Sequence, residues 1–178
     1  LDGECIAVDP MNSDTVYVGT PYQGLYVSRD GGACWEHYDS SVIPCGTVPK
    51  SNAEYNEYNS NGKNFGIRSV YFMDSTVYVG YYGNGIYKSS DSGATWQLID
   101  GSPTKPRRMT DYRGKLYVTC YTDGDNGFND GVYVYNPSDG TWTADAPVSG
   151  TVFGGIAKTV CQSDDVLFCG ADSLVYYK

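Results

Sequence analysis

The sequence predicts an all-β fold made of repeated units of four antiparallel strands, and three observations support this prediction. An eight-residue motif, S-x-D-x-G-x-x-W, occurs at Ser28–Trp35 and again at Ser89–Trp96. The same strand-like phrases, Val-Tyr-Val-Gly and Gly-apolar-Tyr, precede both copies in the same order. The chain of 178 residues also holds 18 Tyr and 22 Gly, which favour pleated strands and tight turns. A repeat of this kind indicates a radial or stacked architecture.

The first two units are the most regular. Apolar and aromatic residues form short runs that end at Gly, Asp or Asn, a pattern typical of strands joined by hairpins. In unit one we expect strands at residues 6–8, 16–19, 24–28 and 35–38, with the octet joining the third strand to the fourth. Unit two repeats this order at residues 68–72, 76–80, 85–89 and 96–99.

The later units depart from the regular strand spacing of units one and two. In unit three we expect strands at residues 108–111, 115–120, 131–135 and 141–144, and its last turn keeps an Asp, a Gly and a Trp without the octet spacing. In unit four we expect strands at residues 155–160, 166–169 and 174–178. Two long segments, 40–66 and 121–130, interrupt the units. Long loops on a rigid scaffold often carry binding residues, although the first could equally be a solvated connector.

The four units predict blades of a β-propeller at about residues 5–39, 67–101, 107–146 and 150–178, with residues 40–66 as an insertion loop. Lys178 aligns with the position just before the octet, so unit four is expected to lack its turn and its outer strand. An unpaired strand edge favours aggregation, and propellers remove such edges by closing a ring that usually holds more blades. We therefore expect a larger ring, completed by more of the same chain or by a partner.

The octet itself is expected to be structural. In a tight turn, an Asp carboxylate and a Ser hydroxyl can accept hydrogen bonds from backbone N–H groups, and a Gly permits a positive φ. The Trp that follows can pack between neighbouring blades. The residues with these roles are Ser28, Asp30, Gly32 and Trp35 in the first copy, and Ser89, Asp91, Gly93 and Trp96 in the second.

The charge and the cysteine content limit the classes of binding partner and the cellular compartment that we expect. The net charge of −9 and a pI near 4.4 disfavour binding to nucleic acid or to anionic lipid. No uncharged apolar run approaches the length needed to span a bilayer. Six cysteines in a Tyr-, Asn- and Gly-rich sequence favour an extracellular, secreted protein with disulfides, and Cys34–Cys45 is the expected pair. The alternative is that several cysteines are buried and reduced.

The octet resembles the Asp-box, or BNR repeat, of sialidases, sortilin-type receptors and the xyloglucanases of glycoside hydrolase family 74. Residues 6–20 and 114–119 are similar to this last family, as are residues 130–135, 140–143 and 153–157 in and after unit three. The resemblance covers nearly the whole chain except residues 45–64. The Asp-box indicates blade architecture, whereas the phrase in unit three favours xyloglucanases over sialidases.

The resemblance implies rings of seven blades, two rings in an enzyme, and a glycan-binding cleft between them. It also implies an inverting mechanism with two Asp residues, one from each ring, spaced to admit a water molecule. In the family, the first-ring Asp follows the second strand of a blade near the start of the enzyme. At the matching places this chain has Pro21 and Tyr82, so no catalytic residue is carried over and the question of enzymatic activity stays open.

The loops that follow the second strands hold the best candidates for a glycan site. Sugar rings present C–H faces that stack on aromatic rings, and nearby Asp and Asn side chains bind hydroxyl groups. The candidates are Tyr22, Tyr81, Tyr82, Tyr121, Asp123, Asp125, Asn126, Phe128 and Asp172. An equally weighted alternative is that these tyrosines only pack between blades.

Other chemistry has little support in the sequence. His37 is the only histidine, which nearly excludes Ser-His-Asp triads and HExxH zinc sites. Residues 80–85 are Gly-rich, but no helix pattern follows, so we expect a hairpin turn rather than a phosphate site. The closely spaced oxygens of residues 123–130 could bind calcium, yet their spacing does not match an EF-hand, and we expect neither a metal nor a cofactor.

Two hypotheses about function fit these observations. In the first, the chain is part of a secreted propeller that resembles a xyloglucan-degrading enzyme and contributes a glycan-binding surface, with a polysaccharide as its partner. In the second, it is a non-catalytic extracellular propeller that serves adhesion or assembly. Hydrolysis of xyloglucan, or retardation in a gel that contains soluble β-glucan, would distinguish the two.

Overall fold

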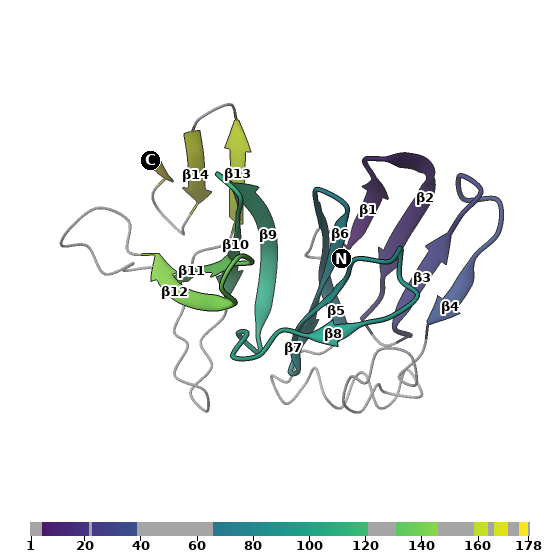
Figure 1. Ribbon diagram of the computed structural model, residues 1–178, viewed down its shortest axis with the longest axis horizontal. Helices are drawn as coiled ribbons and strands as arrows, with labels where there is room; N and C mark the ends of the chain where they lie inside the picture. Colours follow the sequence, from purple (N-terminus) through teal and green to yellow (C-terminus); the bar gives the residue numbers. More distant parts are fainter. Residues whose placement is uncertain are drawn as a thin grey trace.

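The structure is a computed structural model that describes residues 5–21, 23–38, 66–120, 131–145, 159–163, 166–170 and 175–177. These residues form antiparallel β-sheets joined by turns and short connections (Figure 1). Three of the sheets have four strands and one has three. The predicted all-β class and blade architecture are confirmed. Among the described residues, no helix has the length and apolar character that crossing a membrane requires.

The first two sheets, blade 1 and blade 2, have the same strand order, in which each strand pairs with the next along the chain. Side chains alternate between the two faces of a sheet. In the second strand of blade 2, Val77 and Val79 accordingly pack toward blade 1, whereas Tyr78 packs toward blade 3. The strands are β1 (Ile6–Asp9), β2 (Asn12–Gly19), β3 (Leu25–Ser28) and β4 (Glu36–Tyr38), then β5 (Gly66–Met73), β6 (Thr76–Tyr82), β7 (Gly85–Ser89) and β8 (Gln97–Leu98).

Blades 3 and 4 continue this pattern. Strand β13 extends beyond the predicted end at residue 160, because Ser163 still pairs with Val166. The strands are β9 (Pro106–Tyr112), β10 (Lys115–Cys120), β11 (Gly131–Asn136) and β12 (Thr141–Asp145) in blade 3, and β13 (Thr159–Ser163), β14 (Val166–Gly170) and β15 (Val175–Tyr177) in blade 4.

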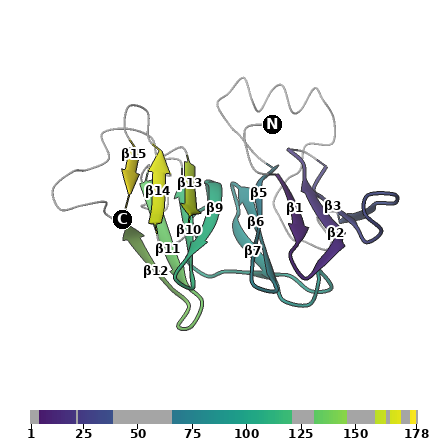
Figure 2. The same cartoon turned by 90° about the horizontal axis from the view of Figure 1, so that it is seen from above.

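The first strands of the four blades follow one another through the molecule. Figure 2 shows β1, β5, β9 and β13 in succession, and each contacts the next. The later strands of every blade lie progressively farther from this row. Meanders that converge on their first strands are the arrangement of blades around a propeller axis.

The hydrophobic core consists of one cluster at each interface between neighbouring blades. Tyr17, Leu25 and Val27 of blade 1 pack on Val70 and other residues of blade 2. A second cluster joins blades 2 and 3, and a third joins blades 3 and 4. Stability therefore comes from blades packing face to face, because a single sheet has no core of its own.

Both octets form the same turn. Ser28 Oγ donates to Asp30 Oδ1 at 2.8 Å and accepts from the Gly32 N–H at 2.8 Å, while Asp30 Oδ1 accepts from the Cys34 N–H at 2.8 Å. Gly32 has a φ of 96°, in the left-handed region that favours glycine. These hydrogen bonds and this φ agree with the structural roles expected of the Ser, the Asp and the Gly.

The second copy repeats this geometry with one additional hydrogen bond. Ser89 Oγ donates to Asp91 Oδ1 at 2.7 Å and accepts from the Gly93 N–H at 2.9 Å. Asp91 accepts from the Thr95 N–H at 2.9 Å and also from the Thr95 hydroxyl at 2.5 Å. The turn is therefore defined by a local network of side-chain-to-backbone hydrogen bonds.

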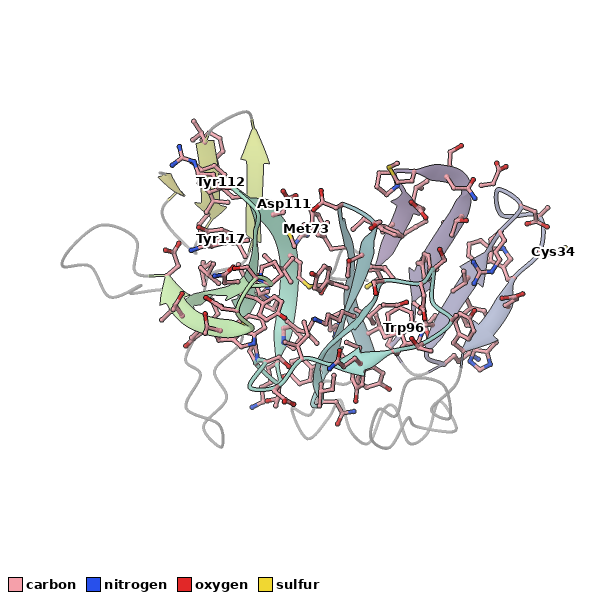
Figure 3. All side chains as sticks on the ribbon, in the orientation of Figure 1. Cys34, Met73, Trp96, Asp111, Tyr112 and Tyr117 are labelled. Carbon is pink, nitrogen blue, oxygen red and sulfur yellow. The ribbon has the colours of Figure 1, made fainter. Side chains whose placement is uncertain are left out.

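The two octet tryptophans lie in different environments. Trp96 packs between blades 1 and 2, where its ring meets Tyr17 edge-on at a centroid distance of 6.4 Å (Figure 3). Arg29 of blade 1 reinforces this contact by donating to the Ser92 carbonyl at 2.9 Å. Trp35, the equivalent residue of blade 1, is 43% exposed. The position of Trp96 agrees with the packing between blades that the sequence suggested.

The expected Cys34–Cys45 disulfide is not formed here. Cys34 is exposed and is a free thiol, and Cys45 lies outside the described residues. The octet turn is already closed by the hydrogen bonds of Ser28 and Asp30, so no covalent link is needed to define it. Cys5, Cys120 and Cys169 are buried, which agrees with the alternative that several cysteines act as small core residues.

Candidate functional site

The predicted binding loops leave the blades at one end, and the structure describes this end for blades 2 and 3. Strand β6 ends there at Tyr82, next to the start of β5, and β10 ends there at Cys120, next to the start of β9. We call residues 66–69, 80–83, 104–108 and 118–120 the basic end, for reasons given below.

Backbone contacts between blades fix the basic end. The Ile67 N–H donates to the Thr20 carbonyl of blade 1 at 3.0 Å, and the Gly83 N–H donates to the Thr104 carbonyl at 2.5 Å. Gly66 has a φ of 84°, and a Cβ there would overlap the backbone of Pro21. Side chains at this end are therefore carried by a backbone with little room to move.

A β-bulge places Arg68 at the basic end of blade 2. Ile67 pairs with Tyr81 and Ser69 pairs with Gly80, so Arg68 is the extra residue of β5 with no counterpart in β6. A bulge redirects the side chain of the extra residue and increases the local twist of the strand. The Arg68 side chain is half-buried.

Blade 3 has the same irregularity at the same place. Pro106 pairs with Cys120 and Arg108 pairs with Thr119, so Arg107 is the extra residue of β9. Arg107 is also half-buried. Two neighbouring first strands therefore carry a bulged arginine at equivalent positions, and these strands contact each other.

The two predicted tyrosines of β6 are buried rather than open. Tyr81 is 2% exposed and belongs to the cluster between blades 1 and 2. Tyr82 is 8% exposed, and the Arg68 guanidinium carbon lies 5.9 Å from the centroid of its ring. Burial of Tyr81 favours the alternative that this tyrosine only packs between blades. In Tyr82, the electron-rich face of the ring is already in contact with the Arg68 guanidinium. Glycan binding by either residue stays a prediction.

The positive charges of the basic end act on a buried thiol of blade 1. The Cys5 thiol donates to the Arg68 carbonyl at 3.3 Å and to the Ile67 carbonyl at 3.5 Å. Burial raises the pKa of this thiol, and the nearby charges of Arg68 and Arg108 oppose the rise. Arg68 of blade 2 and Arg108 of blade 3 thus both lie near this buried thiol of blade 1.

Charge differs between the two ends of the blades. The described basic end contains Arg68, Lys105, Arg107 and Arg108 and no Asp or Glu. At the opposite end, basic and acidic residues are mixed: Asp74, Asp111, Arg113 and Lys115 lie in or beside the first hairpins of blades 2 and 3. There, Tyr71 of blade 2 donates to Asp111 Oδ1 of blade 3 at 2.6 Å, beside Met73 (Figure 3).

The octet carboxylates are unsuited to acid catalysis. Hydrogen bonds from the Cys34 backbone and the Ser28 hydroxyl lower the pKa of Asp30, and those from Thr95 and Ser89 lower the pKa of Asp91 to about 2. A general acid must hold a proton near the working pH. These carboxylates are ionised near neutral pH and committed to turn structure.

The Gly-rich segment forms the hairpin that we expected, and His37 makes local contacts in β4. His37 is exposed in β4, stacks on the Tyr26 ring at a centroid distance of 4.7 Å and contacts the Gln23 carbonyl. Residues 80–85 form the β6–β7 hairpin, in which Tyr81 pairs with Gly85. Within the described part of the chain, no group of three or more His, Cys, Asp or Glu side chains could hold a metal ion.

Most of the predicted glycan-binding residues lie outside the described residues. These are Tyr22, Tyr121, Asp123, Asp125, Asn126, Phe128 and Asp172, and the possible calcium segment 123–130 lies outside as well. Sequence reasoning missed Arg68 and Arg107. One available signal was an arginine just before the apolar first strand in both unit two and unit three.

Comparisons with known proteins agree with the blade architecture. No family model matches the chain. An oligoxyloglucan-reducing end-specific xyloglucanase of Emericella nidulans is 32% identical over 180 residues, covering 85% of this chain and 20% of that enzyme. A xyloglucanase of Hypocrea jecorina is 34% identical over 171 residues, covering 84% of this chain and 20% of that enzyme.

A solved structure extends this likeness to the fold. The family 74 xyloglucanase of Xanthomonas campestris superposes with a TM-score of 0.65 and 21% identity, covering 99% of this chain and 28% of that one. The chain spans about a fifth of the length of the curated relatives that it matches. The chain is therefore a distant homologue of part of the xyloglucanases of glycoside hydrolase family 74, built from the Asp-box blades of a β-propeller.

Proposed function

We propose that this chain forms part of an extracellular β-propeller that binds a polysaccharide of the β-glucan class and contributes a binding surface rather than a complete active site. The observation that carries the proposal is identity of about one third to xyloglucanases over more than four fifths of the chain. The proposed surface is the basic end together with the loops that leave it.

The two positions that match the family's first-ring Asp support binding without catalysis. Pro21 follows β2, and its backbone packs directly against Gly66. Tyr82 ends β6 and is buried beneath Arg68. Neither residue is a carboxylic acid, the group that inverting glycoside hydrolysis uses as its general acid.

Affinity electrophoresis tests this proposal. Native gels with and without tamarind xyloglucan or barley β-glucan should show retardation of the chain, and a reducing-sugar assay should show no hydrolysis. Tyr121→Ala and Phe128→Ala should weaken retardation, because sugar rings stack on aromatic faces. Tyr26→Ala is the matched control, since Tyr26 lies in β3, the third strand of blade 1, stacked on His37.

A second candidate function is assembly, and one observation favours it. Ile6 and Val8 in β1 are 63% and 50% exposed, and Trp35 is 43% exposed. The equivalent residues of blade 2, including Val70 and Trp96, face blade 1 and are covered by it. This pattern fits a surface that receives a further propeller blade. Absence of both retardation and hydrolysis would leave assembly as the supported function.

A further inference from the structure

An anion site needs cationic side chains that lie near one another. Two arginines fit this need, because they occupy equivalent places on strands that contact each other. Arg68 and Arg107 are the bulged residues of β5 and β9. Both strands belong to the row that lines the propeller axis (Figure 2). Backbone hydrogen bonds between blades hold the adjoining segments, so the backbone that carries both side chains is preorganised.

The described charged side chains of this end are all cationic. The chain as a whole carries a net charge of −9, yet the described basic end holds four cationic side chains and no carboxylate. Half-burial of Arg68 and Arg107 strengthens their interaction with a charged ligand, because water screens such a pair less than an exposed one.

The side-chain type points to a carboxylate. A guanidinium presents five N–H donors in a planar fork that matches the two oxygens of a carboxylate, and it can keep other partners at the same time. Arg68 also lies over the Tyr82 ring at 5.9 Å, which restricts its orientation. A neutral glucan has no group that would use two such forks.

We propose that Arg68 and Arg107 bind the carboxylate of an acidic sugar residue, such as a uronic acid in a side chain or at an end of the polysaccharide. This inference rests on the proposed function and narrows it from β-glucans in general to β-glucans that carry uronic acid. Arg108 and Lys105 add to the attraction through their charge and need not contact the ligand.

Isothermal titration calorimetry with a matched ligand pair tests the proposal on the unmodified chain. The probes are a β-glucan oligosaccharide in which one glucose unit is oxidised to glucuronic acid and the same oligosaccharide after reduction of that carboxyl group to an alcohol. We expect the acidic form to bind about tenfold more tightly or better, as loss of a charged hydrogen-bond pair predicts. This preference should shrink as salt is raised.

Variants locate the site. Arg107→Gln should remove most of the preference for the acidic ligand, and Arg107→Lys should restore only part of it, because an ammonium lacks the bidentate fork. Arg113→Gln is the matched control: it removes the same charge at the opposite end, where Arg113 lies 4.9 Å above the Tyr112 ring. Circular dichroism melting curves verify that each variant is folded.

Each outcome decides between the two proposals. Equal binding of both ligands, or an Arg113→Gln effect as large as that of Arg107→Gln, would overturn the carboxylate site while leaving glycan binding intact. Failure of both ligands to bind, together with retardation by xyloglucan, would overturn the carboxylate site alone. Failure of both ligands and of all neutral glucans would overturn both proposals.

Discussion

At the scale of single residues, the chain depends on short polar side chains that complete turns. Ser28 and Ser89 are fully buried although they are polar, because each hydroxyl donates to the octet Asp and accepts from the octet Gly. The Asp of each octet is then an acceptor for backbone N–H groups on the far side of the turn. An ionised carboxylate is the stronger acceptor, so turn stability should depend on pH.

We predict that acid weakens the fold partly through Asp91. Its pKa is about 2 in the folded chain, below the ordinary value of 3.8, so the ionised carboxylate stabilises the fold fully above the ordinary value. This contribution is lost as the pH falls through the folded-state pKa. Urea unfolding at a series of acid pH values should show a flatter pH dependence for Asp91→Asn than for the unmodified chain. Parallel curves for the two proteins would contradict this role.

At the scale of strands and turns, close approach of backbones decides which residues are tolerated. Gly66 and Gly83 both have a positive φ, 84° and 96°. A Cβ on Gly66 would meet the Pro21 backbone, whereas a Cβ on Gly83 would meet nothing within 4 Å. Backbone strain is common to both positions, and the collision is specific to Gly66.

We predict that Gly66→Ala destabilises the chain far more than Gly83→Ala. The left-handed conformation alone costs an alanine about 1–2 kcal/mol, so Gly83→Ala should lower the free energy of unfolding by that amount. Gly66→Ala adds a displacement of blade 1 from blade 2 and should cost about 3 kcal/mol or more. Urea unfolding monitored by Trp fluorescence measures both values. Equal losses would mean that blades 1 and 2 are not held together at this point.

These elements also mark how far the sequence predicts the structure. The octet turns were predictable because their hydrogen bonds join residues at most four positions apart. The bulges at Arg68 and Arg107 were not, since a bulge is defined by register against the next strand. Burial of Tyr81 likewise depends on blade 1, which a local pattern does not place. The loop candidates from Tyr121 to Phe128 remain predictions.

At the scale of the whole molecule, stability is unevenly distributed across the blades. Blade 2 is covered on both faces, by blade 1 and by blade 3, whereas the β1 face of blade 1 that carries Ile6 and Val8 is open. The same kind of residue should therefore contribute differently in the two blades. Val70 is 2% exposed and Val8 is 50% exposed, and both lie in the first strand of their blade.

We predict that Val70→Ala lowers the free energy of unfolding by about 1–3 kcal/mol, because it removes buried methyl groups and leaves a cavity between blades. Val8→Ala should change it by less than about 0.5 kcal/mol, as expected for an exposed site. Thermal or urea unfolding of both variants provides the comparison. A large loss for Val8→Ala would show that its face is covered in solution, which would support the assembly hypothesis.

The order of the strands has a consequence for how such a protein can change in evolution. Each sheet of the described residues consists of consecutive segments and makes its main contacts with the sheets next to it along the chain. A gene segment that encodes one unit can therefore be duplicated or lost without changing the chain path of the others. The inserted copy would carry its own Ser–Asp turn and would present the same kind of packing surface to the neighbouring blades. The number of blades can thus change in evolution while each remaining blade keeps its own strand order and hydrogen bonds.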